Sequence, residues 1–262
     1  MKNRIRSSIA DSLTSISRIW ARNFFLFKRA WLVSAFWIVL EPLFILGALG
    51  YGLGSYVTTI NGRPYVDFFF PALLCNSSMF VAFFVSTYDN FSKLTYQRTY
   101  LTQILTPIEP NEIVLGEILW GATKGTMSAI GVSIIAMFFG LVDPVTILPA
   151  FLVIFISSAV FAALGMIVTT MVHNYEQIIY PSSGIIIPMS LFCGTFFPVE
   201  SLPIGIKQAI YLLPLTHSVS AVRSLLLNGF EWTVLLHSLI LIILLVVLTR
   251  IAIRRLAGKL LN

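Results

Sequence analysis

Six long stretches, each with almost no charged residues, decide what this chain can fold into. Each is near or above the ~20 residues that a helix needs to cross ~30 Å of hydrocarbon. A water-soluble domain does not have this composition, because 57% of the residues are hydrophobic and only 11% are charged. The sequence therefore predicts an all-α integral membrane protein with a single transmembrane domain, residues 1–262. The expected spans are residues 31–54, 68–88, 113–140, 146–172, 177–197 and 232–253.

The positions of lysine and arginine predict how these spans are oriented. Of the seventeen such residues, thirteen lie in the N-terminal segment, between spans two and three, or at the C-terminal end of the chain. The opposite side has only Arg63, Lys207 and Arg223, and Lys124 lies inside span three. Since positive residues accumulate on the cytoplasmic side, both termini are expected in the cytoplasm. Basic residues next to apolar runs indicate contact with an anionic lipid leaflet, not with nucleic acid.

Two amphipathic segments are expected on the cytoplasmic side. Residues 4–24 place basic and apolar residues at helical spacing, which predicts a helix lying in the membrane interface. A disordered basic tail is the alternative for this segment. Residues 94–107, between spans two and three, contain a short amphipathic helix that Pro107 and Pro110 end. It either docks into a partner protein or forms a surface turn held by its own leucines.

The connection between spans five and six is apolar but interrupted by Pro198, Pro203 and Pro214. Prolines break helices, and broken apolar backbone is costly unless it lies at a membrane surface or lines a cavity. Residues 198–228 are therefore expected to form two short re-entrant helices that dip into the membrane from outside. Phe196, Phe197 and Pro198 end span five, where the aromatic pair is either a hydrophobic gate or part of the interfacial aromatic belt.

Three charged residues lie deep inside the expected spans. Glu41 and Lys124 are each ten or eleven residues into a span, which places both at a depth of ~15 Å. Glu117 precedes Lys124 by seven residues and so shares its helical face. Unpaired charges at this depth are expensive. They are expected either to line a pathway or to form a structural ion pair, with Glu41 meeting Lys124 and Glu117 as the competing partner.

The sequence contains no recognisable site for chemistry. It has no phosphate-binding loop of the G-x-x-x-x-G-K-[ST] type and no cluster with metal-ligand spacing. The histidines at 173, 217 and 237 are scattered, and the two cysteines, Cys75 and Cys193, lie in apolar context. We therefore expect no metal and no cofactor bound by this chain, and no enzymatic activity of its own.

One sequence pattern resembles a known family. Leu202-Pro203 is followed after ten residues by Pro214-Leu215-Thr216-His217, and after five more by Arg223. This pattern resembles the signature of the ABC-2 type transporter permeases. Three further stretches look like the branch that exports lipo-oligosaccharides of the nodulation-factor type: EPLFILGALGYGLG (41–54), VLGEILWGATKG (114–125) and GTFFPVESLP (194–203).

The resemblance implies a homodimer with six spans per subunit, paired with two copies of a separate ATPase that binds ATP and Mg²⁺. It implies that residues 4–24 and 94–107 contact the ATPase and that residues 198–228 cap the pathway. Many relatives have an acidic residue where this chain has Leu101. The expected polar contacts to the ATPase are therefore Gln97, Arg98, Thr99 and Gln103.

The expected function is that of a permease subunit in the bacterial inner membrane. With its ATPase it would export a lipid-linked or amphiphilic oligosaccharide. Export of a hydrophobic drug-like molecule is the alternative within the same superfamily. An integral membrane enzyme would need a polar catalytic cluster, and an ion-coupled transporter would favour inverted repeats and more buried carboxylates.

Overall fold

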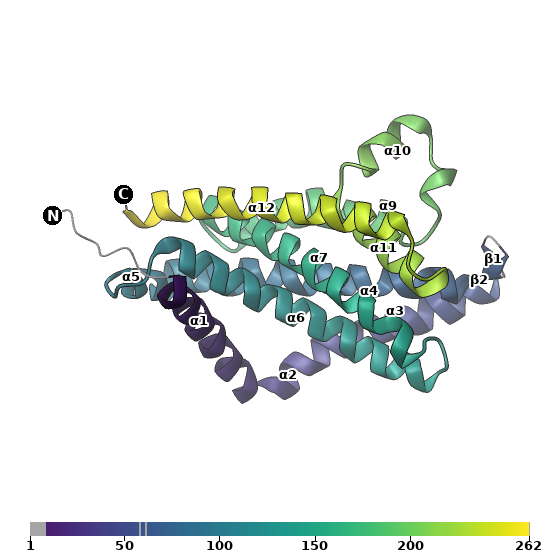
Figure 1. Cartoon of the computed structure of the whole chain (residues 1–262), viewed down its shortest axis with the longest axis horizontal. Helices are drawn as coiled ribbons and strands as arrows, with labels where there is room; N and C mark the ends of the chain where they lie inside the picture. Colours follow the sequence, from purple (N-terminus) through teal and green to yellow (C-terminus); the bar gives the residue numbers. More distant parts are fainter. Residues whose placement is uncertain (1–8, 58, 61, 262) are drawn as a thin grey trace.

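The computed structural model describes residues 9–57, 59–60 and 62–261, and shows an elongated bundle of helices (Figure 1). The long helices α4, α6, α7 and α12 run roughly side by side along the bundle (Figure 1). The longer helices are α1 (Ile9–Arg29), α4 (Tyr65–Phe84), α6 (Pro110–Phe138), α7 (Pro144–Met171), α11 (Pro214–Leu227) and α12 (Trp232–Leu261). The shorter helices are α2 (Trp31–Ala35), α3 (Glu41–Ile45), α5 (Thr99–Ile104), α8 (Ile179–Pro181), α9 (Ile187–Phe192) and α10 (Ile204–Ile210).

Several helical runs include π-helical turns, which join consecutive short helices. Such turns at Phe36–Leu40 and Leu46–Gly52 join α2 and α3 into one run, which a 3-10 turn closes at Leu53–Ser55. Another, Val85–Asp89, extends α4, and Ser92–Tyr96 follows close behind. A small antiparallel hairpin of β1 (Thr59–Ile60) and β2 (Arg63–Pro64) then leads into α4.

The two ends of the bundle carry different elements. The start of α1, the helix α5 and the end of α12 lie at one end, here called the α5 end (Figure 1). The β1–β2 hairpin lies at the other, here called the hairpin end (Figure 1). This arrangement agrees with an even number of crossings.

Five helical stretches among the described residues are long and apolar enough to cross a membrane: Ile38–Ser55, Tyr65–Tyr96, Pro110–Phe138, Pro144–Met171 and Trp232–Leu260. They correspond to predicted spans one, two, three, four and six. The prediction of an all-α integral membrane protein is thus confirmed. Predicted span one begins within α2, and the helix of span six continues beyond residue 253 to Leu261.

Predicted span five is shorter than the sequence indicated. Its helical residues are 176–192, so residues 193–197 of the prediction lie outside it. The chain leaves the helix at Cys193, and Gly194 adopts a left-handed backbone with φ of 78°. A glycine in this conformation is a common way to end a helix. Seventeen residues remain at the short end of the range for a spanning helix.

The N-terminal helix also differs from its predicted range of 4–24. Helix α1 is described from Ile9 and continues to Arg29, so the first residues of the predicted helix lie outside the described part of the chain. Because α1 runs five residues further than predicted, Phe27 is brought against α6, where its ring packs on Trp120 at 5.8 Å.

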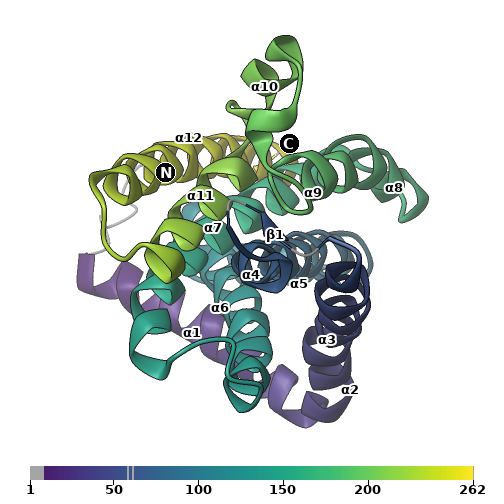
Figure 2. The ribbon, with the colours of Figure 1, turned by 90° about the vertical axis from the view of Figure 1, so that its right-hand side faces the viewer.

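The α10–α11 segment, which includes most of the predicted re-entrant region 198–228, divides into two contrasting helices. They are bent by 86° relative to each other, and counting them as one broken span would raise the number of candidate spans to six. Seen from the hairpin end, α10 stands apart from the bundle whereas α11 lies inside it (Figure 2). The hydroxyl oxygens of Ser157 and Ser218 lie 2.6 Å apart and join α11 to α7. Entry of this segment into the membrane from outside stays a prediction.

Small residues let the central helices approach closely. A Cβ atom added at Gly125 of α6 would lie 2.7 Å from the Ser78 carbonyl oxygen of α4, and one at Gly165 of α7 would lie 2.7 Å from that of Phe83. Close approach through glycine is the usual way that membrane helices gain packing energy, since lipid supplies no hydrophobic drive between them. The core of α4, α6 and α7 is therefore a rigid centre to which the outer elements attach.

Candidate functional site

A buried carboxylate at the α5 end collects charged and polar side chains from three parts of the chain. Glu117 of α6 has a side chain with 0% exposure. One of its oxygens is 2.9 Å from Arg22 Nη2 of α1. The other is 2.6 Å from Lys93 Nζ, and it also accepts a hydrogen bond from Asn23 Nδ2 at 2.8 Å. These four residues are called the Glu117 cluster. The buried charge of Glu117 is compensated by these partners. Removal of one partner would leave a charge uncompensated in the interior, which destabilises the fold.

Local packing explains why α1 reaches Glu117. The preceding residue is Gly116, where an added Cβ atom would come within 2.7 Å of the Ile19 side chain. The absence of a side chain there lets α1 lie directly on α6. Trp20 Nε1 then donates a hydrogen bond to Thr123 Oγ1 at 3.0 Å, and Trp20 and Phe24 pack on Trp120. The interface helix is thus fixed to a transmembrane helix, with Arg22 and Asn23 facing its carboxylate.

The predicted coupling segment, residues 94–107, forms α5 and connects to the same cluster. Arg98 adopts a left-handed backbone with φ of 51°, which sets the turn into α5. Tyr100 is fully buried at 0% exposure. Burial raises the pKa of its hydroxyl well above the ordinary 10.0, and the charge of Glu117 raises it further. Tyr100 belongs to the same buried apolar cluster as Ile19 of α1 and Ile113 of α6, and so attaches α5 to the two helices that carry Arg22 and Glu117.

The outer face of the coupling segment remains open. Leu101 is 39% exposed and Leu105 is 86% exposed. Among the four predicted ATPase contacts, Gln97 and Arg98 are exposed, whereas Thr99 and Gln103 are half-buried. Thr99 donates a hydrogen bond to the Gln97 side chain at 3.3 Å. The segment thus combines an anchored inner face with a mixed apolar and polar outer face, and its contact with an ATPase stays a prediction.

Three stacked tyrosines tie the coupling segment to the loop between α7 and α8. The ring of Tyr175 stacks on Tyr96 at 5.5 Å and on Tyr88 at 6.0 Å. Phe91 meets Tyr175 edge-on at 4.9 Å. Sequence reasoning missed this contact, because Tyr175 is far along the chain and no local pattern marks it. It gives the coupling segment a second attachment, to the helical run that leads into α9.

The expected pair between Glu41 and Lys124 is wrong. Within the described residues, both ion pairs involve Glu117, and neither includes Glu41 or Lys124. Glu41 is exposed, and Lys124 Nζ instead lies 5.7 Å from the centre of the Phe27 ring. Span one meets α6 through Ser128, which donates a hydrogen bond to the Ile38 carbonyl oxygen at 2.7 Å. The two residues have matching depth, but depth does not show which way a side chain faces.

The family signature lies at the hairpin end, and Arg223 is its centre. Arg223 of α11 donates hydrogen bonds to the carbonyl oxygens of Phe68, at 3.2 and 3.1 Å, and of Gly194, at 2.6 Å. Its guanidinium also lies 3.8 Å from the centre of the Phe68 ring. Gly194 follows α9, where carbonyl oxygens lack helical partners and a cation is favoured. Arg223 therefore joins the start of α4 to the end of α9.

The other signature residues shape α10 and α11. Leu202 packs against the core and Pro203 precedes α10. Pro214 is the first residue of α11, where proline costs no helical hydrogen bond. His217 Nε2 donates to the Tyr211 carbonyl oxygen at 2.9 Å, which leaves Nδ1 to accept a hydrogen bond from His237 Nδ1 at 2.9 Å. The histidine pair fastens α11 to α12.

The predicted gate residues pack against different parts of the chain. Phe196 stacks on Phe69 of α4 at 5.7 Å, and its carbonyl oxygen accepts a hydrogen bond from Tyr65 at 3.2 Å. Phe197 instead meets Phe192 at 6.4 Å. Pro198 lies before a 3-10 turn at Val199–Ser201. Phe196 is half-buried and packs against the core, and a gating role for Phe196, Phe197 and Pro198 stays a prediction.

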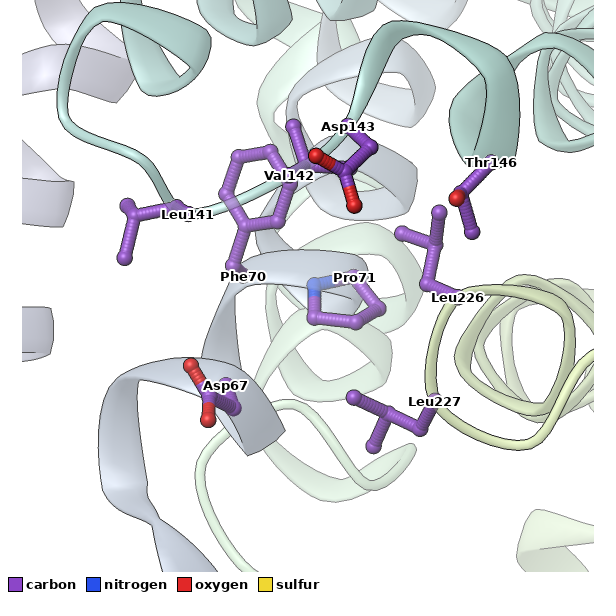
Figure 3. Close-up of a pocket in the computed structure, with 9 residues that line it drawn as sticks. All are labelled: Asp67, Phe70, Pro71, Leu141, Val142, Asp143, Thr146, Leu226 and Leu227. Atoms are coloured by element: carbon purple, nitrogen blue, oxygen red, sulfur yellow. The ribbon is translucent and has the colours of Figure 1, made fainter.

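Two hollows at the hairpin end differ in size. A polar groove of about 620 Å³ is lined by Arg223, Glu200, Glu231 and His237 among others. A smaller pocket of about 140 Å³ lies where α4, the α6–α7 loop and the end of α11 meet (Figure 3). Asp67 and Asp143 line it from opposite segments, with Phe70 and Pro71 between them (Figure 3). The described residues include no group of three or more His, Cys, Asp or Glu side chains that could hold a metal ion.

These features define a membrane transport subunit of a particular class. The chain belongs to the ABC-2 type transporter family, whose sequence model matches residues 14–227. The chain is 34% identical to nodulation protein J of Rhizobium leguminosarum bv. viciae over 229 residues, which are 87% of this chain and 88% of that protein. It is 33% identical to nodulation protein J of Rhizobium meliloti (strain 1021) over 211 residues, 80% of each chain.

A more distant relative matches over a similar length. The inner membrane transport permease YadH of Escherichia coli (strain K12) is 21% identical over 209 residues, which are 80% of this chain and 81% of that protein. The resemblance to the ABC-2 permeases and to their nodulation-factor branch is thereby confirmed.

Proposed function

We propose that this chain is the permease subunit of an ATP-driven exporter that moves an amphiphilic oligosaccharide outward across a bacterial inner membrane. Two copies of the chain would form the pathway, with two copies of a separate ATPase at the α5 end. Family membership and the relatives named nodulation protein J support this proposal. The name of the Escherichia coli relative, an inner membrane transport permease, supports the location.

The observation that carries the proposal is the connection from α5 to the transmembrane helices. Tyr100 anchors α5 in the buried apolar cluster that includes Ile19 of α1 and Ile113 of α6. On the same two helices, Glu117 of α6 holds Arg22 of α1, and it also holds Lys93. A push on the exposed face of α5 would therefore act on α1 and α6 together. Such packed elements transmit displacement because their interiors are dense and resist compression. This is the arrangement expected where an external ATPase drives a membrane domain.

The exposed Glu41 supports a pathway formed between two copies. Glu41 lies within span one, yet its side chain faces away from the bundle. Intramembrane charges almost always face protein or a water-filled cavity. The face of α3 that carries Glu41 is therefore expected to face a second copy or the pathway between copies, which leaves lipid to the other exposed faces.

The experiment tests whether α5 couples ATP hydrolysis to export. The chain would be purified with the ATPase that copurifies with it, and Arg98→Gly and Gln103→Ala would be combined. Glycine at 98 suits the left-handed backbone, so this change removes the side chain without straining the turn. ATP hydrolysis should continue while glycolipid export, measured by mass spectrometry of the outer leaflet, falls by about tenfold or more.

The matched control is Arg254→Ala, which removes an exposed arginine of α12 near the same end. Export by this variant should match that of the unaltered protein. Robust ATP hydrolysis by the chain alone, or normal export by the double variant, would contradict the proposed division of labour.

A further inference from the structure

A pocket at the α5 end lies between α1, the segment that follows α4, and α6. Its volume is about 340 Å³. Residues of α1 and α6 supply an apolar and aromatic wall, which includes Leu26, Phe27 and Trp120. The charged lining residues are Asp89, Lys93 and Lys124. A hollow that is apolar on one side and cationic on the other suits a molecule with a hydrophobic body and an anionic end.

The charges around this pocket do not cancel. Lys93 and Arg22 both bind Glu117, so two cations share one carboxylate. Lys124 has no carboxylate oxygen within 4.0 Å among the described residues, and Asp89 is the only carboxylate among the residues that line the pocket. Three cations therefore face two carboxylates. The excess positive charge lies in a half-buried setting, where an anion would be attracted more strongly than in water.

Lys124 lines the pocket and is positioned to bind an anion there. Its ammonium group lies 5.7 Å from the centre of the Phe27 ring, which orients it without neutralising it. Helix α1 ends just beyond, with the exposed residues Lys28 and Arg29, as expected where a helix lies at an anionic membrane surface. The nearby Leu26 is 54% exposed and continues the apolar wall outward. An acyl chain could therefore remain in lipid while its headgroup enters the pocket.

We propose that this pocket binds the anionic headgroup of an amphiphile, a phosphate, sulfate or carboxylate, with Lys124 as its principal ligand. The amphiphile comes either from the surrounding bilayer or from the exported cargo, and the chemistry recognised is the same. The inference depends on the proposed function only for the location of α1 at the membrane surface. It assigns a role to Lys124, which lies within span three and has no carboxylate oxygen within 4.0 Å among the described residues.

Lipid retention by the full-length chain provides the test. The protein would be purified with its copurifying subunits, without nucleotide, and titrated with dioleoylphosphatidylglycerol or dioleoylphosphatidylcholine. Native mass spectrometry then gives the number of lipids bound and their affinities. One phosphatidylglycerol per chain should bind at least about tenfold more tightly than phosphatidylcholine, because the choline cation cancels the net negative charge of that lipid and would be repelled by Lys93 and Lys124. Lys124→Met should abolish the preference and Lys124→Arg should retain it.

Two further variants keep the test decisive. Arg250→Met removes an exposed cation of α12 at the same end and should leave the preference unchanged. Phe27→Leu removes the ring beside Lys124 and should weaken the preference even if Lys124→Met fails to fold. An unchanged preference in both Lys124→Met and Phe27→Leu, or no preference in the unaltered protein, would overturn the site.

The source of the amphiphile is distinguished in proteoliposomes that contain the ATPase. Fluorescent phosphatidylglycerol that crosses to the other leaflet with ATP, and does so less in Lys124→Met, would identify the bound anion with cargo. Binding without ATP-dependent movement would identify a resident bilayer lipid. Glycerol phosphate that competes as well as the intact lipid would overturn the amphiphile assignment, since the apolar wall would then contribute nothing. The binding measurements need no transport, so a failure of the proposed function would not be mistaken for failure of the site.

Discussion

The two ends of the bundle fix a cation in different ways. At the α5 end, Lys93 and Arg22 form ion pairs with the Glu117 carboxylate, so an opposite charge compensates the cations. At the hairpin end, Arg223 donates hydrogen bonds to the carbonyl oxygens of Phe68 and Gly194, so backbone dipoles stabilise the cation. The first arrangement depends on every member being present. The second stabilises helix ends and leaves no opposite charge behind when the cation is removed.

This difference teaches where the molecule tolerates change. An ion-pair cluster connects separate elements strongly, but it can be switched by moving one member. A cation on carbonyl oxygens has no such alternative state and simply fastens two helices together. The α5 end is therefore suited to transmit a displacement, and the hairpin end to resist one.

The largest effect is expected from Glu117→Gln, which removes the carboxylate of both ion pairs at the α5 end. The change leaves Arg22 and Lys93 without a counter-ion in a buried setting, which costs roughly 3–5 kcal/mol. Folded yield and the thermal unfolding midpoint in detergent should both fall sharply. Glu117→Gln combined with Lys93→Met should recover part of the loss, because one stranded cation is removed.

The control lies five residues earlier on the same helix. Glu112 is buried and accepts a hydrogen bond from the Glu109 backbone N–H at 3.1 Å as part of a helix cap. Glutamine can make the same bond, so Glu112→Gln should cost far less. Equal falls in the unfolding midpoint for Glu117→Gln and Glu112→Gln would mean that the Glu117 cluster contributes no more to stability than an ordinary helix cap.

A smaller effect is expected from Arg223→Met at the hairpin end. Two carbonyl oxygens lose their added donor, and leaving buried acceptors unpaired costs about 1–3 kcal/mol. Arg223→Lys should recover only part, since an ammonium group cannot reproduce the planar fork of donors. The midpoint of thermal unfolding measures both, with Lys207→Met on exposed α10 as the unaffected reference. A larger loss here than at Glu117 would reverse the proposed contrast.

The smallest effect is expected from Tyr100→Phe and depends on pH. Burial raises the folded-state pKa of Tyr100 above its unfolded value of 10.0, because the interior and then Glu117 disfavour the charged form. The neutral hydroxyl therefore contributes fully below pH 10 and its contribution is lost as the pH rises toward the raised value. The unaltered protein should lose stability more steeply above pH 10 than Tyr100→Phe, while the two should be nearly equal at pH 7. Parallel profiles from pH 8 to pH 11 would show that Tyr100 is not buried beside Glu117.

The sequence predicted the spans well because long apolar runs are a strong and local signal. It also predicted a short helix between spans two and three, where α5 lies. It did not predict the ion pair that buries Lys93 against Glu117. Burial of this kind depends on the angular position of α6 relative to α1, and the small residue at Gly116 is the only local hint.

Other errors have the same origin. Equal depth suggested that Glu41 meets Lys124, but the hydrogen bond from Ser128 to Ile38 turns span one so that they do not meet. The sequence likewise did not show that Phe196 and Phe197 pack against different partners, because Gly194 ends the helix before either residue. Side-chain direction is decided by packing between distant segments, and a single sequence does not contain that information directly.

The exposed Glu41 has a consequence for the life of a newly made copy. Glu41 lies near the start of the apolar stretch Ile38–Ser55, and a charged carboxylate that faces lipid costs up to roughly 2.5–3.5 kcal/mol, the figure for the centre of a span. A solitary copy offers this side chain no protein partner. Synthesis in excess of available partners would therefore yield inserted but unstable chains, which local unfolding exposes to membrane proteases. Glu41 would then make each single copy unstable until a second copy covers that face, so that only paired copies persist.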